Sequence, residues 1–196
     1  NAWYTHWAGW VPYATGGDGQ GDCAGQGGNC KDYGTLWAEA HAALAAAPAN
    51  TLRESGWYVL MTMLHETAWH DGLGGPISGW QHNYAGHLKQ AMIYAEAARW
   101  ADGQYAATTA AYPDDIDNDG YPEVVVHNDR LLGVFEATGG RLTNLFVKGP
   151  GYVDTAIGID NAYWPGTTAD FNDANHVAAF SDVGPDYQHQ RYDLTV

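Results

Sequence analysis

Positive charge is scarce in this sequence. The 196 residues include 8 Lys and Arg against 23 Asp and Glu, which gives a formal net charge of −15 at pH 7. A surface of this sign repels phosphate backbones and anionic lipid headgroups. We therefore expect no nucleic-acid partner and no membrane partner, whereas cations and neutral ligands suit the chain.

Long apolar runs are also missing. No stretch approaches the roughly 18 consecutive apolar residues of a transmembrane helix, and no basic segment followed by an apolar one marks a secretory signal at the start. Apolar residues still make up 45% of the chain, which is enough to bury a core. The composition favours a globular protein and fits a secreted one whose signal has been removed.

Cysteine is limited to Cys23 and Cys30. Both lie in the Gly-rich stretch GGDGQGDCAGQGGNC, which is free to bring two thiols together. Two isolated cysteines cannot make a zinc site, and the nearest histidine, His41, falls in the next predicted helix. We expect a disulfide between Cys23 and Cys30, worth about 2–3 kcal/mol, in an oxidising extracellular compartment. Two free thiols are the alternative.

Phenylalanine is rare, with 4 residues, whereas the chain has 13 Tyr and 9 Trp. Tyr and Trp combine an apolar ring with a polar atom, and they often line surfaces that stack on sugars or on protein partners. Trp3, Trp7, Trp10 and Trp80 are candidates for such a surface. Ordinary, partly buried aromatic residues are the alternative.

The first half of the chain has the propensity and periodicity of helices. One helix is expected over 34–48, where Pro48 ends it. A second begins at TLRE, Thr51 to Glu54, which matches a capping box, and runs to about His70. A third spans about 81–101 and ends at Asp102-Gly103. The apolar stripes expected to face the core are Trp57, Leu60, Met61, Leu64 and Ala68 in the second helix, and Tyr84, Leu88, Ala91, Met92, Ala95 and Ala98 in the third.

From Asp114 the pattern changes to that of strands. EVVVHN and LLGVFEA flank a turn at 128–130, and RLTNLFV follows a second turn at 138–140. HVAAFSDV near Val177 and the terminal RYDLTV are weaker strand candidates. We therefore expect an α+β fold: an aromatic and Gly-rich segment over 1–34, a helical bundle over 35–110, and an antiparallel β region over 111–196 that resembles an incomplete sandwich.

The densest charge lies in DDIDNDGYPE, directly before the first of these strands. Asp115, Asp117 and Asp119 take positions 1, 3 and 5 of a calcium-loop pattern, Tyr121 can offer its carbonyl at position 7, and Glu123 its side chain at position 9. Alternate carboxylates in a tight loop converge on one point, where a hard cation relieves their repulsion. We expect Ca²⁺ here in a structural role, and a solvated acidic turn is the alternative.

This loop differs from an EF-hand. Position 12 is Val126, where an EF-hand has a bidentate glutamate, and a strand follows in place of a helix. The aspartates converge without basic neighbours in the sequence, so the pattern predicts that removing calcium lowers the melting temperature.

The stretch LHETAWHDG is suggestive of a zinc metalloprotease, but its spacing argues against one. Zincin histidines are four residues apart and lie about 40° apart around the helix, whereas His65 and His70 are five apart and about 140° apart. His82 and His87 have the same spacing. A cross-helix pair such as His65 with His87 stays open, and a hydrogen-bonded His65 on an apolar stripe is the alternative.

The run from GWYVLMTMLHETAWHDG to AEAARWA, followed by DIDNDGYPEVVVHNDRLLGVFEATGGRLTNLF, resembles the region after the barrel in glycoside hydrolase family 57 proteins. In that family an incomplete barrel precedes a helical bundle and often a β-sandwich that starts with an acidic strand. The resemblance covers the chain from about residue 35. Family members act on α-glucans through a Glu and an Asp on barrel strands. No such strands precede residue 35 here, so no catalytic residue carries over.

The resemblance does imply a contribution of the bundle to a sugar site. In the family, an acidic residue close to a tryptophan reaches toward the substrate, and HETAW supplies Glu66 and Trp69, with His65 beside them. The residue directly before the aromatic is Ala68, where the family has an acid. Were activity to reside in this chain, Glu66 would need Asp71 as its second carboxylate.

The resemblance, taken with the acidic loop, implies a calcium-stabilised, non-catalytic accessory region of an extracellular α-glucan-acting protein similar to glycoside hydrolase family 57. Two other classes stay open: a secreted subunit that assembles by strand addition, and a free-standing carbohydrate-binding module. Pairing of exposed strand edges is expected in either case, because only four or five strands are predicted and RYDLTV ends at Val196 without a closing partner. We therefore expect self-association, or association with the rest of a longer chain, through β edges.

Overall fold

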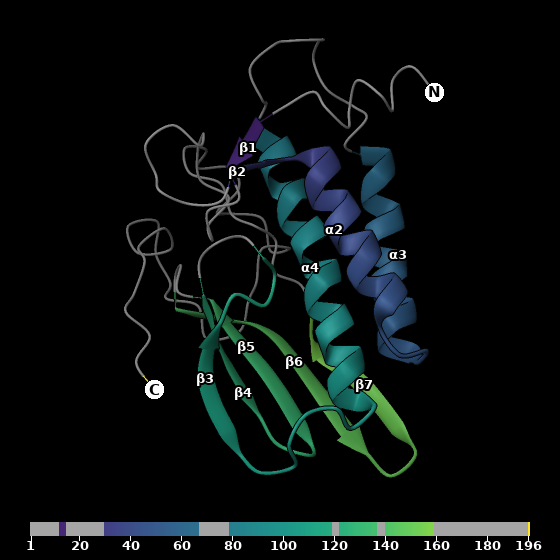
Figure 1. Ribbon diagram of the computed structural model, residues 1–196, viewed down its shortest axis with the longest axis vertical. Helices are drawn as coiled ribbons and strands as arrows, with labels where there is room; N and C mark the ends of the chain where they lie inside the picture. Colours follow the sequence, from purple (N-terminus) through teal and green to yellow (C-terminus); the bar gives the residue numbers. More distant parts are fainter. Residues whose placement is uncertain (1–11, 15–29, 67–78, 119–121, 137–139, 159–195) are drawn as a thin grey trace.

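The computed structural model describes residues 12–14, 30–66, 79–118, 122–136, 140–158 and 196, and the structural statements below concern these residues. It confirms the predicted α+β fold. Three helices are followed by a five-stranded antiparallel sheet that does not close on itself (Figure 1).

The helices are α2 (Tyr33–Ala46), α3 (Thr51–Glu66) and α4 (Gly79–Ala101). Helix α4 packs against both α2 and α3. All its residues from Leu88 to Ala95 are buried, because other helices and the sheet cover it on different sides. It ends as predicted, where Gly103 takes φ of 83° and donates its N–H to the Trp100 carbonyl at 3.0 Å.

The cap of α3 lies one residue earlier than the capping box predicted. The Oδ1 atom of Asn50 accepts hydrogen bonds from the backbone N–H groups of Leu52 and Arg53, both at 3.1 Å. Its Nδ2 atom donates to the carbonyl of Ala98 in α4 at 2.9 Å. Thr51 is therefore the exposed first residue of the helix and not its cap. The sequence prediction was wrong here because asparagine caps a helix as well as threonine does.

Helix α3 buries the face that carries Leu52, Gly56 and Leu60. A Cβ atom at Gly56 would lie 2.5 Å from Cδ2 of Leu44 and 2.9 Å from Cβ of Tyr94. Glycine thus allows α3 to approach α2 and α4 closely. Met61, which was predicted to lie on the apolar stripe, is 53% exposed, because it is rotated about 100° from Leu60 around the helix.

The sheet is a meander in the order β3-β4-β5-β6-β7. Its strands are β3 (Ala110–Asp114), β4 (Glu123–His127), β5 (Leu131–Glu136), β6 (Arg141–Gly149) and β7 (Tyr152–Ile157). The predicted turn between β4 and β5 is confirmed, since Oδ1 of Asn128 accepts from the N–H groups of Arg130 and Leu131 at 2.8 and 2.9 Å.

Four strands were not predicted from the sequence. Strands β3 and β7 lie at the two edges of the sheet. Both consist mainly of small or polar residues and contain few large apolar ones. Strands β1 (Pro12–Ala14) and β2 (Cys30–Asp32) form a separate pair within the Gly-rich segment. Strands β3 and β7 gave no clear strand signal because they bury little apolar surface, and β1 and β2 are only three residues long.

One hydrophobic core joins the helices to the sheet. Val125, Leu132, Val134 and Phe146 of the sheet belong to the same buried cluster as the core residues of the three helices. The rings of Tyr94 and Phe146 meet edge to face with centroids 5.3 Å apart. This shared core places the β3–β4 loop beside the helical layer.

Several predicted features lie outside the described residues. They are the strands near Val177 and at RYDLTV, the side chains of Trp3, Trp7 and Trp10, and Cys23. Cys30 lies in β2 and Trp80 in α4, but their side chains are not described, so the disulfide and the aromatic surface stay predictions. No described helix combines the length and apolar character needed to cross a bilayer.

Candidate metal centre

Three of the predicted calcium ligands meet at the turn between β3 and β4. Asp115, Asp117 and Glu123 each place one carboxylate oxygen so that all three atoms lie within 4.8 Å of one another. Two oxygens bound to a common Ca²⁺ at 2.3–2.6 Å can be up to about 5 Å apart. The three carboxylates can therefore share one ion without rearrangement of the loop backbone.

The local backbone explains why they meet. The N–H of Asn118 donates to the carbonyl of Asp115 at 3.3 Å, and Asn118 takes φ of 61°, a left-handed conformation that asparagine tolerates. Ile116, between the two aspartates, is buried in the core and donates its N–H to Oε2 of Glu123 at 3.1 Å. Ile116 thus packs into the core, while the carboxylates of Asp115 and Asp117 lie near that of Glu123 at the start of β4.

Two further contacts tie this loop to the helices. Nζ of Lys89 in α4 lies 3.3 Å from Oδ2 of Asp117, and both side chains are buried. Nδ2 of Asn118 donates to Oε2 of Glu39 in α2 at 2.9 Å. The loop therefore contacts α2, α4 and β4 together, at the junction of the helical layer and the sheet.

Lys89 corrects the expectation that the aspartates have no basic neighbour. The basic residue comes from α4, which is distant in sequence but packs beside the loop. Among the described residues, the three carboxylates outnumber the Lys89 ammonium in a site where Asp117 is 3% and Glu123 1% exposed. Burying such charges is costly unless they are compensated, and a divalent cation carries the required charge.

The donor set fits a hard cation. All three described ligands are carboxylate oxygens, which suit Ca²⁺, Mg²⁺ or Mn²⁺ better than Zn²⁺ or Cu²⁺. Calcium takes six to eight oxygen ligands, so three side chains leave positions for other groups and for water. The Asp119 side chain and the Tyr121 carbonyl are the predicted further ligands, and both residues lie outside the described part of the chain.

A cavity of about 420 Å³ lies beside the cluster, between α2, α4 and the loop. Asp115 lines it and is half-buried, whereas Asp117 and Glu123 are not among its lining residues. A cation entering through this cavity would meet Asp115 first. The lining residues are Glu39, Ala42, Ala43, Met92, Glu96, Arg99, Asp115, Ile116 and Asn118.

A group of three packed aromatic rings, one buried and two half-buried, lies near the other end of β4. His127 is 5% exposed, and its ring meets those of Tyr105 and Tyr112 edge to face at 5.1 and 5.7 Å. The hydroxyl of Tyr105 donates to Oε2 of Glu96 at 3.0 Å. Burial, together with the negative charge of Glu96, raises the pKa of Tyr105, and burial also raises the pKa of Tyr112. These tyrosines are therefore held neutral well above pH 7.

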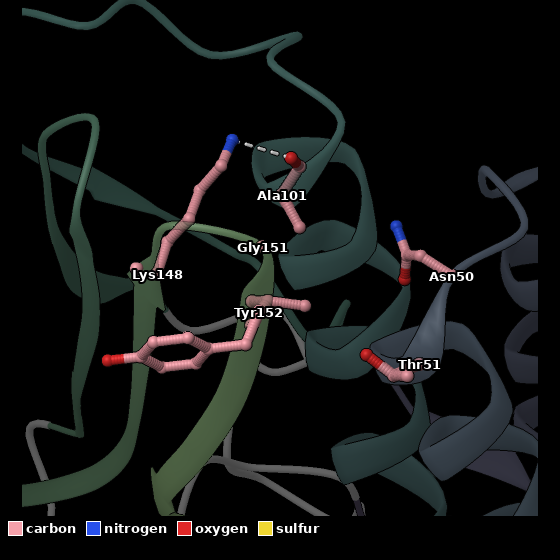
Figure 2. Close-up of a pocket in the computed structure, with 8 residues that line it drawn as sticks. Asn50, Thr51, Ala101, Lys148, Gly151 and Tyr152 are labelled. Carbon is pink, nitrogen blue, oxygen red and sulfur yellow. Dashed lines mark hydrogen bonds between the residues drawn. The ribbon is translucent and has the colours of Figure 1, made fainter.

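The second cavity, of about 530 Å³, lies where the start of α3 and the end of α4 meet the β6–β7 turn (Figure 2). Nζ of Lys148 donates to the carbonyl of Ala101 at 2.7 Å, and the ring of Tyr152 points away from Asn50 and Thr51. None of the described residues that line it is acidic, so these residues do not supply the carboxylate pair of a glycosidase site. Those residues are Asn50, Thr51, Ala101, Lys148, Gly149, Gly151, Tyr152 and Val153.

The predicted sugar contacts are described only in part. His65 and Glu66 form the end of α3, but their side chains are not described, and Trp69 lies outside the described residues. The residues that sequence reasoning missed are Lys89 and Glu39. Lys89 directly follows Leu88 of the predicted apolar stripe, and a lysine at the border of such a stripe can indicate a buried ion pair.

No protein-family model matches the chain, and no match to it was found among the curated proteins or the solved structures. The resemblance to glycoside hydrolase family 57 therefore stays a prediction from the sequence.

Proposed function

We propose that this protein binds one Ca²⁺ ion through Asp115, Asp117 and Glu123, and that the ion fixes the β3–β4 loop against the helices. The observation that carries the proposal is the meeting of three carboxylates, two of them buried, with the Lys89 ammonium beside Asp117. We assign the ion a structural role, because its proposed ligands join the loop to β4 and to α4.

Each ligand would have a distinct part. Glu123 accepts the N–H of Ile116 through Oε2 and so holds the loop closed around the site. Asp117 contacts Lys89 of α4, and Asp115 lines the adjacent cavity. The ion would supply the positive charge that keeps these carboxylates together.

We propose further, from the sequence resemblance, that the chain is a non-catalytic accessory region of an extracellular protein that acts on α-glucans. Calcium sites of extracellular modules have dissociation constants of about 10⁻⁴–10⁻³ M, which suits a site with few protein carboxylates. A pull-down on an α-glucan tests this role. We expect retention of the chain and its loss in Trp69→Ala, whereas no retention of the unaltered chain would contradict it.

Assembly through the sheet edges is the second candidate. Strands β3 and β7 each lack a further partner strand within the described sheet, and unpaired edges can accept a strand of another chain. Light scattering tests this candidate, because it predicts a species larger than the 21.2 kDa chain.

Thermal unfolding with a chelator and with excess Ca²⁺ tests the metal site. At a calcium concentration of about 100 times the dissociation constant, binding stabilises the folded state by about 2.7 kcal/mol. For a chain of this size, that corresponds to a rise in melting temperature of about 5–10 °C.

The test has a matched pair of variants. Asp117→Asn should lose the response to calcium, whereas Asp129→Asn should keep it, because Asp129 is an exposed carboxylate in the β4–β5 turn, at the other end of β4 from Glu123. Since Asp117→Asn also weakens the contact with Lys89, the readout is the calcium response and not the melting temperature itself. Identical melting curves with chelator and with calcium would refute the proposal.

A further inference from the structure

The buried position of Lys89 is unusual for an amine. The residue is 6% exposed, and its neighbours Leu88 and Gln90 are also buried. Lysine is almost never fully buried unless its ammonium is paired, and one pairing contact here is Asp117 Oδ2 at 3.3 Å. Because the pair is shielded from water, the charge of one partner strongly affects the other.

The same carboxylate belongs to the group proposed to bind Ca²⁺. A divalent ion at Asp117 would lie within a few ångströms of the Lys89 ammonium, and two positive charges at that distance repel each other in a site of low dielectric. Lys89 and the ion are therefore competitors for the same negative charge. Glu39 and the Glu96–Arg99 pair line the adjacent cavity.

We infer that Lys89 is a built-in counter-ion of the cation site: it compensates Asp117 when no divalent ion is bound, and it lowers the affinity of the site for Ca²⁺. This inference rests on the proposed function. It predicts that the loop keeps its position at low calcium and that binding occurs only when calcium is abundant. Lys89 is thus an affinity-setting residue and not a ligand.

Lys89→Met tests the inference, because methionine keeps most of the side-chain length and removes the charge. We expect Lys89→Met to bind Ca²⁺ at least about tenfold more tightly by calorimetric titration, and to melt at a lower temperature in chelator, because the Lys89 charge no longer compensates Asp117. Lys89→Arg keeps the charge and should keep an affinity close to that of the unaltered protein. Lys148→Met is the matched control, since Lys148 contacts Ala101 and not the acidic loop.

A measurement on the unaltered protein covers the case in which Lys89→Met does not fold. The labelling rate of each lysine by an amine-directed reagent, read peptide by peptide by mass spectrometry, should rise at Lys89 when Ca²⁺ is added. The rate at Lys148 should stay the same. A Lys89 rate that calcium leaves unchanged would overturn the inference.

The outcomes separate the two proposals. If neither the unaltered protein nor any variant binds Ca²⁺, the proposed function is wrong. If the unaltered protein binds Ca²⁺ and Lys89→Met binds it equally or more weakly, the site is real and only the role of Lys89 is wrong. Tighter binding by Lys89→Met, with no change in Lys148→Met, supports both.

Discussion

Nδ2 of Asn144 in β6 donates a hydrogen bond of 2.8 Å to Oε1 of Gln90 in α4, and both side chains are buried. Gln90 directly follows Lys89, which contacts Asp117 in the acidic loop. Two consecutive residues of α4 therefore contact β6 and the loop, so the position of the helix on the sheet and the geometry of the loop are set together.

Replacing Asn144 alone should be costly. Asn144→Leu leaves the buried amide of Gln90 without this partner, and we expect the free energy of unfolding to fall by about 1–3 kcal/mol in urea denaturation. The double variant Gln90→Leu/Asn144→Leu removes both amides and should recover part of the loss. Additive effects of the two single changes would contradict coupling between these residues.

Asn50 and Thr51 provide a direct comparison of the two candidate caps of α3. Asn50→Ala removes the acceptor of the Leu52 and Arg53 N–H groups and should cost about 1–2 kcal/mol. Thr51→Ala should change stability by less than about 0.5 kcal/mol, because the exposed first residue of the helix makes no capping contact. A larger loss of stability for Thr51→Ala than for Asn50→Ala in chemical denaturation would instead support Thr51 as the helix cap.

Gly56→Ala should destabilise the protein although alanine is the better helix former. The added methyl group would lie 2.5 Å from Leu44 and 2.9 Å from Tyr94, so α3 must move away from its neighbours, at a cost of about 1–3 kcal/mol. Thr62→Ala is the control on the exposed face of α3, where the change should be neutral or slightly stabilising. A gain in melting temperature for Gly56→Ala would show that the helices are not in close contact there.

Alkaline pH should weaken the fold through the half-buried Tyr105. Below about pH 10 tyrosine is neutral in both states, but above it the unfolded chain ionises Tyr105 while the folded chain, whose Tyr105 pKa is raised by burial and by Glu96, does not. The unfolded state then binds fewer protons, so the free energy of unfolding falls as the pH rises.

Tyr105→Phe should make this fall shallower. Denaturation of the variant at about pH 8 should show a loss of about 1 kcal/mol from the missing hydrogen bond to Glu96, and the loss should shrink at about pH 11. Tyr58→Phe, at a 74% exposed position, is the control and should follow the unaltered protein. Equal pH dependence in all three proteins would contradict the role of Tyr105.

The sequence predicted those parts of the fold that depend on local patterns. The periodicity of α4, the Gly103 end and the turn at Asn128 all follow from short stretches of chain, and the structure confirms them. The strands β3 and β7 were missed because an edge strand needs little apolar surface. Asn50 was missed because two neighbouring residues could both cap the helix.

The candidate site likewise has a part that the local sequence predicted and a part that it did not. The pattern of alternate carboxylates predicted that Asp115, Asp117 and Glu123 meet, and they do. Lys89 and Glu39 reach the loop from helices that are distant in the sequence, and only the packing of α2 and α4 brings them there. The position of Lys89 beside an apolar stripe can suggest a buried ion pair, but the local sequence does not identify its partner.

Calorimetric titration of Ca²⁺ into protein freed of metal by a chelator tests the central claim most directly. We predict one bound ion per chain with a dissociation constant of about 10⁻⁴–10⁻³ M. Glu123→Gln keeps the size of the side chain and an acceptor for the Ile116 N–H, but it removes a ligand charge and should weaken binding at least about tenfold. Asp129→Asn should bind as the unaltered protein does. No binding at millimolar calcium, or equal binding by Glu123→Gln, would contradict a calcium site at the β3–β4 loop.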